Sequence, residues 1–215
     1  SNFIIHLAGE NRPEDEKNLD IVNAKLTKSI CESICSVDKH IPIILASSTQ
    51  ATFDNAYGKS KLDAELILKK LESDTGNPIY IYRLPGVFGK WCKPNYNSVV
   101  ATFCHNISNN LSIQVNDPSF ELSLVYIDDV VGEFVKTIQG KQDSKKEPSI
   151  QPEYKIKLGD LAAQIELFKD TRKSLISERV GVGLVRKLYS TYVSYLPPEQ
   201  FSYSIPSYGD DRGMF

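Results

Sequence analysis

Apolar residues alternate between short runs and helical stripes along the first part of the chain. The runs at 3–9, 41–48 and 77–89 are mainly apolar and end near Gly or Ser, which is typical of buried strands that lead into loops. Between them, 18–34 and 56–73 carry apolar residues at helical spacing. This alternation of strand and helix predicts a parallel sheet with helices on both faces, an α/β fold.

The pattern is less regular after residue 89. Segment 90–107 predicts a loop and then a helix capped by Asn97 or Ser98. We expect short strands at 111–115 and 122–126, with a helix running on to 138.

The later part of the chain predicts a linker followed by helix. The charged, apolar-poor stretch 139–153 is typical of a surface linker. Helical patterning resumes at 158–176, and Tyr189, Tyr192 and Tyr195 follow at helical spacing, which favours a core stripe.

Composition excludes several kinds of partner. The net charge of −2 gives no long-range attraction to phosphate backbones, so no nucleic acid is expected. No apolar run approaches the roughly 20 residues of a membrane helix, so no membrane partner is expected. The 4 Cys and 3 His lack zinc-site spacing, so we expect no metal and free thiols in a reducing cytoplasm.

Candidate chemistry lies in "SSTQATFDNAYGKSK". Ser47 and Ser48 end a predicted strand, and the four-residue spacing of Tyr57 and Lys61 places both on one helix face. A cation about 4 Å from a phenol is worth about 4 kcal/mol at an effective dielectric constant near 20, which lowers the tyrosine pKa by up to about three units. Such a tyrosine can exchange a proton with an oxygen whose carbon gains or loses hydride, while a serine hydroxyl orients that oxygen.

Several further motifs occur in one order: "HLAG", "NAKLT", "ASST", "YGKSK", "RLPGVFG" and "YIDDVV". In this the chain resembles the extended short-chain dehydrogenase/reductases, the NAD(P)-dependent epimerases, dehydratases and ketoreductases of nucleotide sugars. The resemblance covers most of 3–131. It implies a Rossmann-like sheet with a smaller, mostly helical substrate-binding part.

The segments "HLAGENRPE", "DNAYGKSKLDAE", "GKWCKPNYNSVVATFC", "LYSTYVSYLP" and "DDRGMF" give a narrower resemblance. They resemble the bifunctional capsular polysaccharide enzymes, in which a reductase domain precedes a cupin domain. This implies reduction of a 4-keto UDP-N-acetyl-6-deoxyhexose, a UDP-sugar substrate, by NADP(H) or NAD(H), on the route to UDP-N-acetyl-L-fucosamine. It also implies a cytoplasmic homodimer.

The resemblance also implies the role of each site residue. The catalytic set is Ser48, Tyr57, Lys61 and Asn23, with Thr49 as an alternative to Ser48. The cofactor contacts are Ala8, Gly9, Tyr57, Lys61, Leu84 and Pro85. The substrate contacts are Gly86, where relatives usually carry Asn, together with Lys90, Asn95 and Asn97.

Four segments are expected on this basis. They are a reductase core at 1–138 with a substrate loop at 90–125, the linker 139–153, a helical substrate-side segment at 154–205, and the start of a linker to a cupin domain at 206–215. A Gly-rich phosphate-binding turn is expected in such a fold but is not found, since no strand precedes "GVG" at 181–183. We therefore expect that the chain lacks the first βαβ unit and is inactive alone.

Other interpretations stay open. The chain could be a UDP-sugar 4-epimerase or dehydratase with tightly held NAD, or a non-catalytic dinucleotide sensor. Asp128 and Asp129 are expected to cap a helix rather than to catalyse. His6 is expected to be a hydrogen-bonded core residue, and His105 an ordinary one.

Overall fold

The computed structural model describes residues 2–11, 20–37, 39–141 and 147–214. They belong to two compact units, each with its own core: Ser1–Val87 with Ile127–Glu153, and Phe88–Tyr126 with Tyr154–Phe215. The first unit carries most of the candidate site residues.

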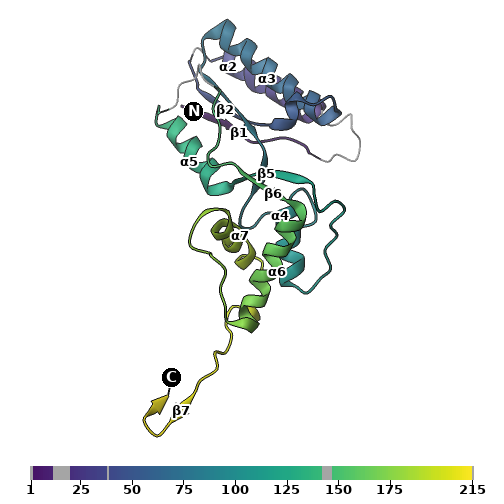
Figure 1. The fold of residues 1–215 in the computed structure, drawn as a ribbon. Coiled ribbons are helices and arrows are strands. Elements are labelled where there is room, and N and C mark those ends of the chain that lie inside the picture. Colours follow the sequence, from purple (N-terminus) through teal and green to yellow (C-terminus); the bar gives the residue numbers. More distant parts are fainter. Residues whose placement is uncertain (1, 12–19, 38, 142–146, 215) are drawn as a thin grey trace. The chain divides into compact units, whose positions relative to one another are not determined.

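A parallel sheet lies at the centre of the first unit (Figure 1). Its strands, in spatial order, are β1 (Ile4–His6), β2 (Ile43–Ser48) and β3 (Ile79–Leu84). Both neighbouring pairs are parallel, and Ser48 at the end of β2 pairs with Leu84 at the end of β3. The predicted parallel sheet is therefore confirmed.

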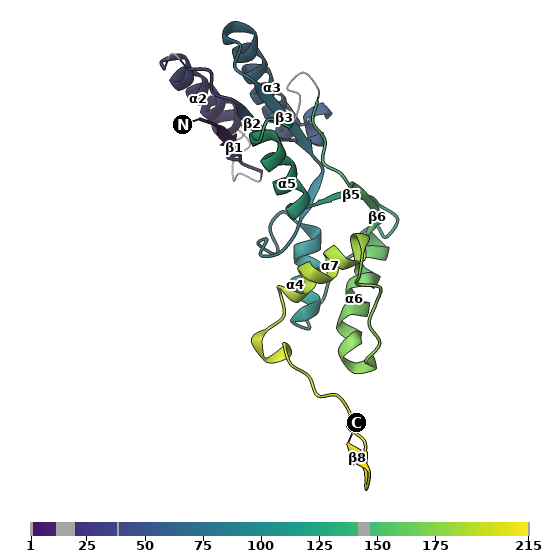
Figure 2. The same cartoon turned by 90° about the vertical axis from the view of Figure 1, so that its left-hand side faces the viewer.

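Helices cover both faces of this sheet, as Figures 1 and 2 show. They are the π-helical turn η1 (Asp20–Lys25), which continues into α2 (Leu26–Cys35), the 3₁₀ turn η2 (Thr49–Thr52), α3 (Ala56–Thr75) and α5 (Ile127–Ile138). Apolar side chains of α2 and α3 pack against alternate residues of β2 and β3 on one face. On the other face the Tyr82 ring lies 4.9 Å from Phe134, and its hydroxyl is 2.6 Å from Thr137 of α5.

The second unit combines a small sheet with helices. The sheet has the order β4 (Gly86–Phe88), β5 (Glu121–Tyr126) and β6 (Tyr154–Lys157), with β5 and β6 antiparallel. The remaining elements are α4 (Val99–Ser108), α6 (Leu158–Ser174), α7 (Gly183–Val193), the 3₁₀ turn η3 (Pro198–Gln200), and the pair β7 (Gly209–Asp210) and β8 (Gly213–Met214).

Aromatic packing forms much of the core of the second unit. The Phe168 ring of α6 lies 5.2 Å from Tyr189 and 5.9 Å from Tyr192, both on α7. The ring of Tyr195 meets His105 of α4 edge to face at 6.3 Å. The tyrosine stripe is therefore a packing surface, as its spacing predicts.

Three details of the expected fold are wrong. The run 77–89 does not form one strand: β3 ends before Pro85, which has no N–H to donate to a ladder, and β4 joins the other sheet. Residues 111–115 form no strand. The segment from 154 onward opens with strand β6 rather than helix, because alternate residues of β6 are half-buried where it pairs with β5.

Other details agree with the sequence. The Ser98 hydroxyl accepts a hydrogen bond from the Ala101 N–H at 3.3 Å and so caps α4, as one of the two predicted caps. Asp128 and Asp129 lie in the first turn of α5, where negative charge is stabilising. No helix in the described ranges is both long and apolar enough to cross a bilayer.

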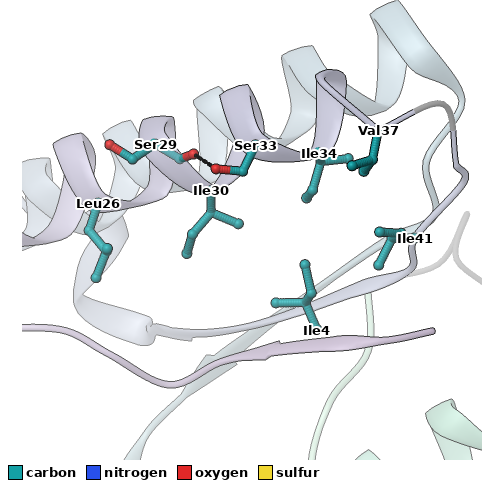
Figure 3. Close-up of a pocket in the computed structure, with 8 residues that line it drawn as sticks. All are labelled: Ile4, Leu26, Ser29, Ile30, Ser33, Ile34, Val37 and Ile41. Atoms are coloured by element: carbon teal, nitrogen blue, oxygen red, sulfur yellow. Dashed lines mark hydrogen bonds between the residues drawn. The ribbon is translucent and has the colours of Figure 1, made fainter. Parts of the chain in front are cut away.

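An apolar groove of about 460 Å³ lies between β1 and α2 (Figure 3). Ile4 lies below it, and α2 contributes Leu26, Ile30 and Ile34 from above. Its polar residues are two serines, so it holds none of the proton-transfer groups predicted from the sequence. The candidate site is elsewhere in the unit.

Candidate active site

The carboxyl ends of β1 and β2 bring the candidate residues together with the start of α3. Crevices at this edge of a parallel sheet are where such folds bind ligands. Ser48 ends β2 in an extended conformation, and its side-chain oxygen accepts a hydrogen bond from the Gln50 N–H at 3.2 Å. This contact starts η2, the short turn that leads directly to α3.

The position of Tyr57 follows from how α3 begins. The Asn55 side chain caps the helix by accepting a 2.7 Å hydrogen bond from the Gly58 N–H, which places Tyr57 in the first turn. The phenol is half-buried. Burial raises its pKa above the ordinary value, and a hydrogen bond with the Ser48 hydroxyl acts in the opposite direction. The Ser48 hydroxyl is thus one of the groups that influence the Tyr57 phenol.

Lys61 lies one turn further along the same face and is almost completely buried. Its ammonium is 5.8 Å from the centre of the Tyr57 ring. Burial lowers its own pKa. The expectation that Lys61 sets the Tyr57 pKa therefore needs correction: the ammonium lies over the ring, and in this structure desolvation dominates and raises the phenol pKa.

Gly9 leaves the space that Lys61 occupies. A Cβ atom at Gly9 would lie 2.7 Å from the Lys61 Nζ and 2.9 Å from the Asn23 Oδ1, both inside ordinary contact distances. The Lys61 ammonium and the Asn23 amide therefore lie close to the backbone of Gly9, just after β1. An exposed glycine beside a buried cation and an amide suits the polar ribose of a dinucleotide, which needs close backbone approach and hydrogen-bond donors.

Asn23 is a buried connector between three segments. Its Oδ1 accepts a hydrogen bond from the Glu10 N–H at 3.0 Å, and its Nδ2 donates to the Glu10 carbonyl and, at 2.9 Å, to the Ser60 Oγ. Ser60 in turn donates to the Tyr57 carbonyl at 2.8 Å. Asn23 lies in η1, and π-helical turns inside helices are often found at functional sites.

His6 is a hydrogen-bonded core residue, as predicted. It is buried, and its Nε2 lies 3.0 Å from the Thr27 Oγ1, which itself donates to the Asn23 carbonyl at 2.6 Å. Burial and then the nearby Lys61 charge lower the His6 pKa, so the ring is held neutral. Its contact helps to fix the helical turn that carries Asn23.

The remaining predicted contacts divide between the two units. Ala8 and Gly9 are exposed after β1, while Leu84, Pro85 and Gly86 follow directly at the end of β3. Lys90, Asn95 and Asn97 belong to the second unit. In the first unit the structure groups five predicted site residues: Gly9, Asn23, Ser48, Tyr57 and Lys61. Residues 84–86 lie at the end of the neighbouring strand β3. The loop residues Lys90, Asn95 and Asn97 belong to the other unit.

The loop after β4 presents aromatic rings to solvent. Trp91 is 83% exposed and has the Lys90 ammonium 5.7 Å from its ring. Lys93 lies similarly, 5.3 Å from the Tyr96 ring. The loop is held at its base because the Tyr195 hydroxyl donates to the Cys92 carbonyl and the Thr102 Oγ1 accepts from the Asn95 N–H.

Sequence reasoning missed two features around Tyr57. Glu65, one further turn along α3, is buried and paired with Arg83. Gly58 is required for packing, because a Cβ there would lie 2.3 Å from the Gln50 carbonyl oxygen and 2.6 Å from that of Phe53. The continued four-residue spacing 57–61–65 could have revealed the first feature; the second depends on the turn η2, which has no clear pattern.

Gly58→Ala should therefore lower both stability and activity of the intact protein. The added methyl would meet two backbone oxygens, so the start of α3 must move from η2 and carry Tyr57 with it. We expect a loss of about 1–3 kcal/mol in the free energy of unfolding. Gly132→Ala in α5 is the control, since a Cβ there has no neighbour within 4 Å. Chemical denaturation compares the two, and equal stability of both variants would contradict the packing argument.

The chain has recognisable relatives among known proteins. Residues 1–151 match the sequence model of the NAD dependent epimerase/dehydratase family. A curated UDP-2-acetamido-2,6-beta-L-arabino-hexul-4-ose reductase from Pseudomonas aeruginosa is 51% identical over 214 residues, which are 100% of this chain and 58% of that protein. The chain thus spans little more than half the length of this relative.

Two solved structures show the similarity in three dimensions. The capsular polysaccharide assembling protein CapF from Staphylococcus aureus has a TM-score of 0.90 at 43% identity, over 100% of this chain and 58% of CapF. The UDP-glucuronic acid 4-epimerase from Bacillus cereus, solved in complex with NAD, has a TM-score of 0.74 at 17% identity, over 90% of this chain and 74% of that one. The second similarity concerns the fold alone.

Proposed function

The chain belongs to the NAD dependent epimerase/dehydratase family, and on this basis we propose that the intact protein reduces the 4-keto group of a UDP-N-acetyl-6-deoxyhexose, with NADPH as the reductant. The observation that carries the proposal is the placement of Tyr57 and Lys61 on one face of α3, with the ammonium 5.8 Å from the centre of the phenol ring, together with Ser48 at the end of the neighbouring strand β2. The name of the Pseudomonas reductase supports the substrate class, because a hexul-4-ose carries a ketone at C4.

Each residue of the first unit has a chemical task in this reaction. Tyr57 gives its proton to the carbonyl oxygen of the substrate, and the Ser48 hydroxyl donates a hydrogen bond that orients the same oxygen. Lys61 holds the ribose next to the nicotinamide, where Gly9 permits close approach, and Asn23 supports a proton relay. Reduced nicotinamide, when bound, supplies the hydride that the carbonyl carbon accepts.

The raised pKa of Tyr57 suits a proton donor. In a reduction the tyrosine must be protonated when the substrate arrives, and burial keeps it so at neutral pH. Activity should therefore fall on the alkaline side as Tyr57 loses its proton. The positive charge of Lys61, 5.8 Å from the centre of the ring, stabilises the phenolate that proton donation leaves behind.

The loop that carries Trp91 is proposed to bind the nucleotide part of the substrate. An exposed indole with a lysine against it can stack on uracil, and Lys90 and Lys93 can pair with diphosphate oxygens. Asn95 and Asn97 are exposed on the same loop and supply amide groups for hydrogen bonds. Gly86, which has no side chain, leaves room beside the sugar.

The test is the oxidation of NADPH by the intact protein in the presence of a 4-keto UDP-N-acetyl-6-deoxyhexose. We expect one NADPH to be consumed for each sugar that is reduced, and NADH to be a poorer donor. The reaction is measured by the loss of reduced-nicotinamide absorbance. Tightly bound NAD after purification, together with substrate conversion that consumes no added NADPH, would indicate an epimerase or dehydratase instead.

A further inference from the structure

A buried carboxylate lies two helical turns beyond Tyr57 and takes no part in the proposed proton transfer. Glu65 of α3 is fully buried, and its side chain makes every described contact with the ends of two strands. Arg83 of β3 donates to it through Nε at 3.0 Å and through Nη2 at 2.6 Å. Ser47 of β2 donates its hydroxyl to Oε1 at 2.5 Å.

This cluster links α3 to the ends of β2 and β3, three of the elements that carry candidate site residues. Ser47 immediately precedes Ser48, the candidate site residue at the end of β2. Arg83 immediately precedes Leu84 and is paired with Ser47 in the register of β2 and β3. Because Tyr57, Lys61 and Glu65 follow at four-residue spacing, the carboxylate shares the helix face of the two candidate catalytic groups.

Stability alone is a weak reason for such a pair. Burying a carboxylate costs desolvation free energy that its partners only offset, and a buried ion pair often contributes little net stability compared with apolar residues of the same size. A two-point contact between guanidinium and carboxylate does, however, fix distance and orientation. Here it fixes the face of α3 relative to the ends of β2 and β3.

We propose that Glu65 is a positioning residue: through Ser47 and Arg83 it holds the ends of β2 and β3 in register with the face of α3, so that Ser48 at the end of β2 keeps its position relative to Tyr57. The inference rests on the proposed function, since Tyr57 is the group that it positions. Glu65 acts through Ser47 and Arg83 and contacts neither substrate nor cofactor.

A change at Glu65 can act on the Tyr57 pKa in two opposite directions. Besides Glu65, the charged or titratable groups around this arrangement are Lys61 on α3, His6 on β1 and Arg83 on β3, with Glu147 acting on Arg83. Removing the negative charge of Glu65 would by itself favour the phenolate and lower the Tyr57 pKa. Moving the Ser48 hydroxyl away from Tyr57 would instead raise the phenol pKa, since that hydroxyl is the lowering influence.

The experiment compares Glu65→Gln and Ser47→Ala with wild type in the intact protein. Tyr57 is titrated by NMR of ¹³C-labelled tyrosine, its signal being assigned by its loss in Tyr57→Phe. We expect the Tyr57 pKa to rise by about half a unit in both variants. We also expect kcat for the keto sugar to fall about tenfold while KM for NADPH changes less than twofold. Asp63→Asn, which removes one negative charge from the exposed side of the same helix, should change neither.

The outcomes separate this inference from the proposed function. The NMR titration needs no turnover, so it reads the positioning of Tyr57 even if the sugar proves not to be a substrate. If Glu65→Gln does not fold, Ser47→Ala decides, because it removes a single hydroxyl. A Tyr57 pKa that is unchanged or lowered in the folded variants would overturn the positioning role.

Discussion

Replacing Tyr57 with phenylalanine is expected to lower kcat of the intact protein by about 10²–10⁴, the usual contribution of a positioned proton donor. The change removes the hydroxyl and keeps the ring, so packing at the start of α3 and the contact with Lys61 are retained. Affinity for NADPH should stay within a few fold of wild type, because the phenol supplies a proton and contributes little to cofactor binding.

Steady-state kinetics and isothermal titration with NADPH measure the two quantities. Tyr208→Phe is a suitable control, since Tyr208 is 66% exposed and its loss of a hydroxyl should leave kcat unchanged. A Tyr57→Phe protein that kept more than a tenth of the wild-type kcat would exclude Tyr57 as the proton donor.

Replacing Lys61 with methionine is expected to weaken NADPH binding at least tenfold and to move the alkaline limb of the pH–rate profile upward. The first effect follows from loss of a buried cation that faces Gly9 and Asn23. The second follows because the Lys61 ammonium, 5.8 Å from the centre of the phenol ring, favours the phenolate, although burial has the larger effect on the phenol pKa. Without it the Tyr57 pKa, already raised by burial, rises further.

Lys59→Met provides a matched control on the same helix. The Lys59 side chain is 66% exposed and pairs with Asp54 at 2.9 Å, so its removal should alter neither NADPH affinity nor the alkaline limb. Pairs of this exposed kind contribute little. An active Lys61→Met protein with an unmoved limb would show that Lys61 does not act on Tyr57.

The sequence predicted the sheet and the central residues because both leave a periodic signal. Buried parallel strands give continuous apolar runs such as 41–48, and two residues on one helix face repeat every four positions, as Tyr57 and Lys61 do. The break at Pro85 was also present in the sequence, but the apolar run continues across it. The change of sheet at that point is a tertiary effect that the local pattern does not record.

Other features depend on partners that are distant in the sequence. Asn23 looks like any polar residue of an amphipathic helix, and only the fold shows that it joins Glu10 to Ser60. The pair of Glu65 and Arg83 is separated by 18 residues in the chain. The pKa of Tyr57 was predicted from charge alone, whereas burial, which depends on how α3 packs on η2, has the larger effect.

The most direct test of the central claim is to follow the hydrogen that the sugar gains. The intact protein is incubated with NADPH deuterated at C4 of the nicotinamide, on whichever face is transferred, and with a 4-keto UDP-N-acetyl-6-deoxyhexose. We predict one deuterium at C4 of the product sugar, one NADP⁺ formed for each sugar, and loss of this transfer in Tyr57→Phe. A product without deuterium at C4, or conversion without net oxidation of NADPH, would contradict the assignment of this chain to a 4-keto sugar reductase.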